Sequence, residues 1–80
     1  MGTPREQTEA RVIQTVSRAL KAQVNEGSTR DNTPAWDSLR HIEVVFSIED
    51  ELGLEFSESE QVELMSVRRI VDIVMKRHAA

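Results

Sequence analysis

The chain has 80 residues, of which 39% are hydrophobic and 30% charged, enough for one soluble domain with a single core. The lack of cysteine excludes a disulfide framework, a thiolate metal site and a cysteine nucleophile. The net charge of −4 argues against nucleic acid as a partner, because phosphates attract basic surfaces. With only three Gly, two Pro and two Phe, an all-β fold is also disfavoured.

The charge is distributed unevenly along the chain. Residues 37–63 hold nine acidic side chains and a single basic one, Arg40, whereas residues 1–36 and 64–80 are each net basic. Such segregation is typical of a surface that meets a basic partner, although a solvated acidic face is an equally common explanation. The central segment is therefore the first candidate for an interaction surface.

The first predicted helix begins near Pro4. Thr3 can cap it, Pro4 suits its first position and Glu6 completes a capping box. Apolar residues then recur at helical spacing and predict a helix over about 4–23. Residues 25–35 are turn formers without such spacing, so we expect a loop there.

The second predicted helix starts at Asp37 or Ser38 and ends at Leu52, where Gly53 stops it. Its apolar residues fall on two faces. Val44, Val45, Ile48 and Leu52 form a stripe that suits the core, whereas the other face carries Leu39, Ile42 and Phe46 bordered by carboxylates. That second face is either a docking surface or part of a helix buried nearly all round.

Two shorter segments complete the expected fold. Ser57 and Glu60 form a capping box that opens a third helix to about Leu64, and Ser66 can cap a fourth. We therefore expect an all-α four-helix bundle with a long loop between helices 1 and 2 and a short third helix. It forms one domain over residues 1–80, ordered over about 4–77. The residues predicted to be buried are Val16, Leu20, Ile48, Leu52, Phe56, Ile70 and Val74.

The residues with chemical interest lie where the long loop meets the second helix. A serine at such a place is usually a cap, but Asp37 can make the cap and leave the Ser38 hydroxyl open to an enzyme. The helix N-terminus also favours a phosphate esterified there, by about 0.3–1 kcal/mol.

The chain from Asp37 to about Ile73 carries a series of residues at defined spacing. They are Asp37-Ser38-Leu39, Glu43-Val44, Glu49-Asp50-Glu51, Leu52, Glu55-Phe56, Leu64, Val67 and Asp72. In this order and without a gap, the series resembles the acyl carrier protein family. The resemblance covers nearly half of the chain.

The resemblance implies that Ser38 carries 4′-phosphopantetheine, transferred from coenzyme A by a separate phosphopantetheinyl transferase with Mg²⁺. The thiol of this arm would hold acyl groups as thioesters, and the core stripe would border a cavity that shelters them. Asp37 would orient the serine or help to bind the metal of the transferase, and Leu39 would lie beside the arm. The family positions that meet basic patches of partner enzymes are here Leu39, Ile42, Glu43, Phe46, Glu49 and Asp50.

Three features depart from carriers of housekeeping fatty-acid synthesis. Arg40 stands where those carriers have an acid, which makes it a further candidate for partner contact. The loop before Ser38 is a few residues shorter, and Ser57 replaces a proline. Together with Trp36, these features are similar to discrete carriers of specialised pathways.

Other residues are expected to have structural roles. His41 is predicted to be a surface residue beside Ser38, Trp36 a loop anchor on the core, and Met65 and Met75 core residues. We expect no enzyme activity of its own, a cytoplasmic monomer, and no membrane insertion. A different class of function, an unmodified helical adaptor that binds partners through its acidic second helix, stays open as the alternative.

Overall fold

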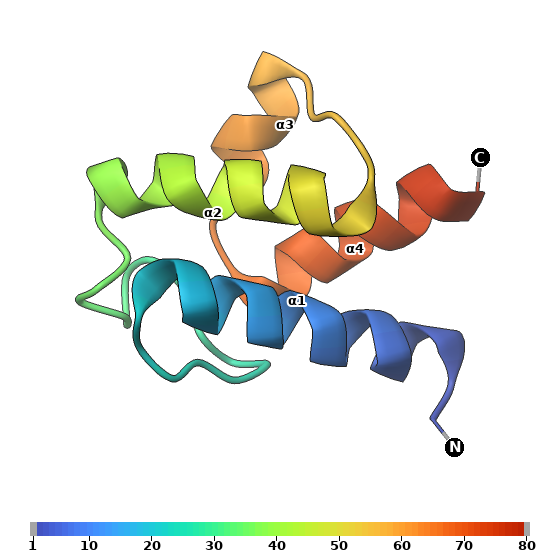
Figure 1. The fold of residues 1–80 in the computed structure, drawn as a ribbon, viewed down its shortest axis with the longest axis horizontal. Coiled ribbons are helices and arrows are strands. Elements are labelled where there is room, and N and C mark those ends of the chain that lie inside the picture. The colour runs from blue at the N-terminus through green and yellow to red at the C-terminus, as the bar shows by residue number, and fades with distance from the viewer. Residues whose placement is uncertain (1, 80) are drawn as a thin grey trace.

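A computed structural model describes residues 2–79 as four α-helices in a small bundle (Figure 1). The helices are α1 (Pro4–Leu20), α2 (Ser38–Leu52), α3 (Glu58–Glu63) and α4 (Val67–Ala79). α1 and α2 run antiparallel and pack together, α4 packs on α1, and the short α3 contacts α4 (Figure 1). The expected all-α bundle, with its long first loop and short third helix, is confirmed.

The predicted cap of each helix is made by the expected side chain. The capping box predicted for α1 is not complete, because the Glu6 carboxylate accepts from the Thr3 hydroxyl at 3.3 Å and not from the Thr3 N–H. The Thr3 hydroxyl accepts from the Glu6 N–H at 3.1 Å, and Ser66 accepts from the Arg69 N–H at the same distance. α3 begins with the complete reciprocal capping box of Ser57 and Glu60. Each cap satisfies backbone N–H groups that have no partner within the helix, which is why these sequences fix helix starts so well.

The end of α1 differs from the prediction. The helix stops at Leu20 instead of near residue 23, because Lys21 takes a left-handed conformation with φ of 53°. The N–H of Ala22 then donates back to the Ser17 carbonyl at 3.2 Å, and the Val24 N–H donates to the Ser17 hydroxyl at 3.3 Å. This turn brings Val24 into the core, and burial of an apolar side chain outweighs continuation of the helix.

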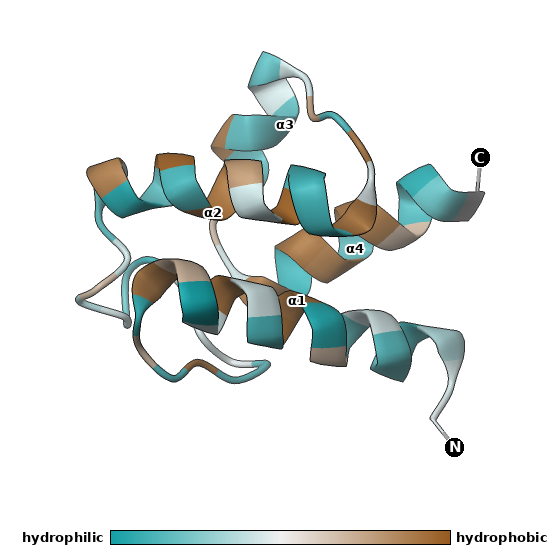
Figure 2. Cartoon of the chain, in the orientation of Figure 1, coloured by the Kyte–Doolittle hydropathy of each residue, from teal (hydrophilic) through white to brown (hydrophobic). Residues whose placement is uncertain are grey.

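The core is made by apolar residues of all helices except α3, together with loop residues. All seven residues predicted to be buried are buried, and so are Val44 and Val45 of the predicted α2 stripe. Hydrophobic residues recur along the whole of α2 and in the first half of α4 (Figure 2). Within residues 2–79, no helix is long and apolar enough to cross a membrane.

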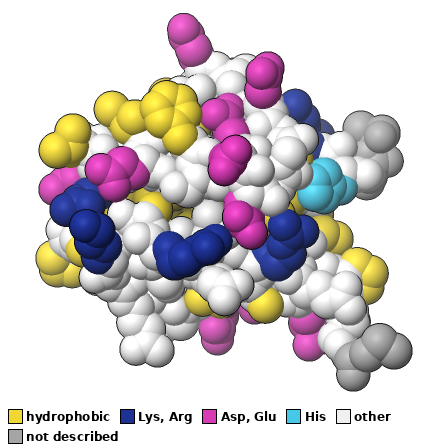
Figure 3. All heavy atoms as spheres, in the orientation of Figure 1, with side chains coloured by type: hydrophobic (Ala, Val, Ile, Leu, Met, Phe, Trp, Pro, Cys, Tyr) yellow, Lys and Arg dark blue, Asp and Glu magenta, His cyan; other side chains and the backbone are white. Residues whose placement is uncertain are grey.

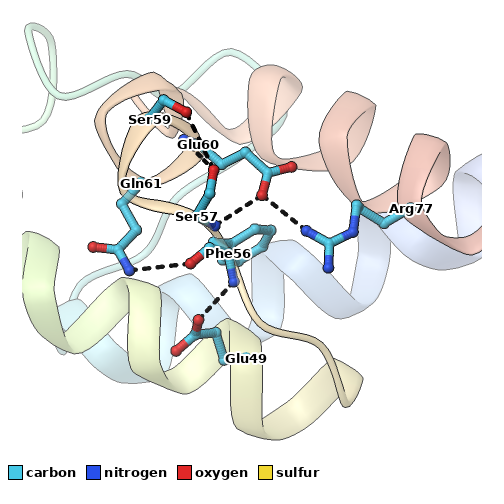
Figure 4. A network of polar contacts seen from close by, with 7 residues as sticks. All are labelled: Glu49, Phe56, Ser57, Ser59, Glu60, Gln61 and Arg77. Carbon is cyan, nitrogen blue, oxygen red and sulfur yellow. Dashed lines mark hydrogen bonds and ion pairs between the residues drawn. The ribbon is translucent and has the colours of Figure 1, made fainter.

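α3 has no buried residue, so polar contacts hold it in place (Figure 4). The segment before it is bound on both sides: Glu49 of α2 accepts from the Phe56 N–H at 2.8 Å, and the Gln61 side chain donates to the Phe56 carbonyl at 3.3 Å. Glu60 accepts from the Ser57 N–H at 2.9 Å and pairs with Arg77 of α4 at 2.8 Å. Glu60 thus joins the start of α3 to the last turns of α4.

Glu60 should make stability depend on pH. The Ser57 N–H and, after it, the Arg77 guanidinium hold the pKa of the Glu60 carboxyl below its ordinary value. A carboxyl with a lowered pKa in the folded state stabilises the fold above its unfolded pKa and loses this effect as the pH falls through the folded pKa. Glu60→Gln keeps the capping box but removes the charge. In urea unfolding, the advantage of wild type over Glu60→Gln should therefore be largest near pH 7 and shrink towards about pH 3.

Glu58→Gln is the matched control, because Glu58 lies in the same turn without the Ser57 and Arg77 contacts of Glu60. Its stability difference from wild type should change less with pH. Equal pH dependence in the two variants would contradict a specific role of the Glu60 contacts.

Candidate functional site

Ser38 is the first residue of α2 and is exposed. The preceding residue makes the cap: an Asp37 carboxylate oxygen accepts from the Arg40 N–H at 2.8 Å. The Ser38 hydroxyl is therefore not used to cap the helix. This confirms the prediction that Asp37 can make the cap. Among the described residues its hydrogen-bond partner is Arg30, whose Nη2 donates to Ser38 Oγ at 3.2 Å.

The loop residue Trp36 fixes the chain just before Ser38. Its side chain is 2% exposed, which confirms the prediction of a loop anchor on the core. The indole Nε1–H donates to Nδ1 of His41 at 3.1 Å, and the two rings stack with centroids 6.2 Å apart. An indole N–H can only donate, so Nδ1 of His41 accepts and Nε2 carries the ring proton.

The prediction that His41 is a surface residue needs correction. Its ring is half-buried, and Nε2 lies 2.9 Å from the Gln61 carbonyl of α3, to which it donates. His41 therefore links α2 to α3 while Trp36 holds it from the loop. Because both ring nitrogens are engaged within the fold, His41 does not act as a base for Ser38 in this arrangement.

The loop segment that contains Arg30 is bound to the connection between α3 and α4. Thr29 and Ser66 form an isolated antiparallel bridge, in which the Arg30 N–H donates to the Met65 carbonyl at 2.9 Å. The Val67 N–H donates to the Ser28 carbonyl at 3.0 Å. The long loop is thus pinned to the α3–α4 connection, and this contact places Arg30 beside Ser38.

Met65 was predicted to lie in the core, and this is wrong: its side chain is 42% exposed. Its backbone is fixed by Arg30, and its sulfur lies 3.6 Å from Arg30 Nη1. The bridge turns the side chain outward, whereas Met75 packs partly buried against the core as expected. Arg30 was not predicted to be a site residue, because nothing local relates it to a residue 35 positions away.

The outer face of α2 carries the predicted apolar strip. Leu39 is 71% exposed, Ile42 52% and Phe46 62%, so this side of α2 is not buried in the bundle. Figure 3 shows hydrophobic side chains gathered over the first half of α2, with carboxylates beside them. Outside α2, two further apolar residues are exposed that were not predicted to be, Val62 of α3 at 72% and Met65.

The charged residues predicted on this face have different surroundings. Arg40 pairs with Glu43 one turn later at 3.4 Å, so each partly neutralises the other. Asp50 is exposed near the end of α2. Glu49 is half-buried and holds the Phe56 N–H, so its carboxylate stabilises the α2–α3 connection.

The cavity expected beside the core stripe stays a prediction. A hollow of about 600 Å³ beside the end of α2 is lined by Glu49, Gly53, Leu54, Glu55, Arg77 and His78. Four of these six side chains are titratable or charged, so this hollow does not offer an apolar surface to an acyl chain. In the part of the chain that the structure describes, no group of three or more His, Asp or Glu side chains could hold a metal ion.

The arrangement can present a hydroxyl group but does not activate it. A guanidinium has five N–H donors and no acceptor, so Arg30 cannot take the proton of Ser38. A serine without a base is a weak nucleophile. Among the described residues, the side chain that contacts the Ser38 hydroxyl is not a base, so a reaction at this oxygen would need a base from elsewhere.

Comparison with known proteins adds no family to this description. No protein-family model matches the chain, and no curated protein matches it significantly.

Because Asp37 caps α2 and Ser38 does not, mutations of the two residues should change the stability of the fold by different amounts. Asp37→Ala removes the cap and should destabilise the fold by about 0.5–2 kcal/mol, whereas Asp37→Asn keeps an oxygen acceptor and should cost much less. Ser38→Ala removes only the exposed contact with Arg30, so it should cost less than half of the Asp37→Ala effect. Urea unfolding of the three variants measures this. If Ser38→Ala costs as much as Asp37→Ala, Ser38 has a structural role as a cap.

Proposed function

We propose that this chain is an acyl carrier protein that bears 4′-phosphopantetheine on Ser38. It delivers acyl or related intermediates, as thioesters, to enzymes of fatty-acid, polyketide or other specialised biosynthesis. The observation that carries the proposal is the exposed Ser38 hydroxyl, which stands at a helix start whose cap is made by Asp37. The series of residues that resembles acyl carrier proteins supports it independently.

Attachment requires a phosphopantetheinyl transferase, coenzyme A and Mg²⁺. Ser38 Oγ forms a bond to the phosphorus next to pantetheine, the pyrophosphate bond of coenzyme A breaks, and adenosine 3′,5′-bisphosphate leaves. The hydroxyl proton passes to a base of the transferase, because Arg30, its neighbour here, cannot accept one. The arm supplies a thiol to a chain that has no cysteine of its own.

Partner enzymes dock on the outer face of α2. Leu39, Ile42 and Phe46 provide apolar area beside Ser38. Glu43 and Asp50 are exposed and attract basic patches, whereas Glu49 contributes mainly by holding the α2–α3 connection. Opposite charges steer association and set partner choice more than they add affinity.

The basic residue Arg40 bears on which partner enzymes the proposed carrier serves. Its positive charge lies two residues after Ser38, and within residues 2–79 the carboxylate that pairs with it is that of the exposed Glu43. A dedicated partner accommodates this charge, whereas an enzyme built for an acid at that position does not. This supports a carrier of a specialised pathway. We further propose that it acts as a monomer in the cytoplasm.

The direct test is covalent modification. Incubated with coenzyme A, Mg²⁺ and a broad-specificity transferase, the wild-type protein should gain one phosphopantetheinyl group, measured as intact mass. Ser38→Ala should gain none, while Asp37→Asn, which keeps the cap, should still be modified if the carboxylate is needed only for positioning. No gain with several transferases would instead favour an unmodified adaptor that binds through α2.

Docking can be tested with the transferase as the probe. Glu43→Lys should lower kcat/KM for modification several-fold, whereas Glu26→Lys, the same change at an exposed loop residue, should leave it nearly unchanged. Stability should change by only about 0.5 kcal/mol for either variant. The difference should shrink as salt rises, because exposed charges are screened over about 8 Å at physiological ionic strength. Equal effects of the two variants would place docking elsewhere.

A further inference from the structure

The side chain of Arg30 is a cation whose contacts among the described residues are with uncharged groups. Its Nη2 donates to Ser38 Oγ at 3.2 Å and its Nη1 lies 3.6 Å from the Met65 sulfur, both uncharged groups. Within residues 2–79, no carboxylate forms an ion pair with it. A hydroxyl engages only one of the five N–H donors of a guanidinium, which leaves donors for a further acceptor at the same place.

The backbone that carries Arg30 is fixed before any ligand binds. The Arg30 N–H is bound to the Met65 carbonyl, and the neighbouring Thr29 is bridged to Ser66. Within the loop, the Thr29 N–H donates to Asn32 Oδ1 at 2.8 Å, and the Asn32 N–H donates to Thr29 Oγ1 at 3.1 Å. An arginine held in this way has already lost part of the freedom that binding would otherwise restrict.

We propose that Arg30 is the residue that positions the phosphodiester on Ser38, an inference that rests on the proposed function. The phosphorus is joined to Ser38 Oγ itself, the atom that Arg30 already contacts. A phosphodiester carries one negative charge on its two non-bridging oxygens, and hydrogen bonds from a guanidinium to such oxygens are roughly twice as strong as neutral ones.

This contact gives the arm a preferred direction at its base. Arg30 comes from the loop and is tied to the α3–α4 connection at Met65, so it draws the phosphate towards that side of α2. The exposed side chain of Met65 lies on the same guanidinium. Lysine, a point charge without the planar fork, should replace arginine only partly.

The test compares unmodified and modified protein in a thermodynamic cycle. Wild type, Arg30→Gln, Arg30→Lys and Arg18→Gln are each modified to completion, as checked by intact mass, and the urea midpoint is measured before and after. Arg18 is the control because it pairs with Glu51 at the other end of α2, so its loss removes the same charge away from Ser38. The ³¹P resonance of each modified protein provides a second readout.

Modification should raise the urea midpoint of wild type and of Arg18→Gln by the same amount. In Arg30→Gln this rise should fall by at least half, with Arg30→Lys between the two, and the ³¹P resonance should move only in the Arg30 variants. If all four proteins show the same midpoint rise and the same ³¹P resonance, Arg30 does not hold the phosphate, although the carrier function stands. If wild type is not modified at all, the proposed function fails, and this inference fails with it.

Discussion

The hydrogen bond between the Asp37 carboxylate and the Arg40 N–H determines what Ser38 can do. The first turn of a helix has N–H groups that need an acceptor, and a serine at that position commonly supplies it. Here the preceding residue does so, and the Ser38 hydroxyl stays at the surface at the start of a rigid helix. The rest of the site is organised around that hydroxyl, with Trp36 fixing the chain before it and Arg30 beside it.

The two sides of α2 are stabilised by different forces. The side facing α1 is held by apolar burial, with Val44 and Ile48 completely buried. The surroundings of Ser38 and α3 depend mainly on polar contacts: the His41 link to Gln61, the Glu60–Arg77 pair and the bridge of Thr29 to Ser66. Polar contacts at a surface contribute little individually, so this region should open more readily than the core. This combination suits the carrier function that we propose, in which several enzymes dock on this side of α2.

The features that could be predicted from the sequence are those whose interactions are local. The caps at Thr3, Asp37 and Ser57 are contacts over three residues, and the core stripe of α2 follows from helical periodicity. The features that could not be predicted are those in which distant segments meet. The exposure of Met65, the embedding of His41 and the placement of Arg30 all follow from contacts between the loop, α2 and the α3–α4 connection, and no local pattern encodes them. The early end of α1 has the same origin, because Val24 gains a place in the core.

The most direct measurement is the tandem mass spectrum of one tryptic peptide from protein treated with transferase and coenzyme A. Cleavage after Arg30 and Arg40 releases residues 31–40, in which Ser38 is the only serine. The carrier function predicts that this peptide bears the phosphopantetheinyl group and that fragmentation assigns the group to Ser38. An unmodified peptide 31–40, or a group assigned to Thr33 or to another peptide, would contradict it.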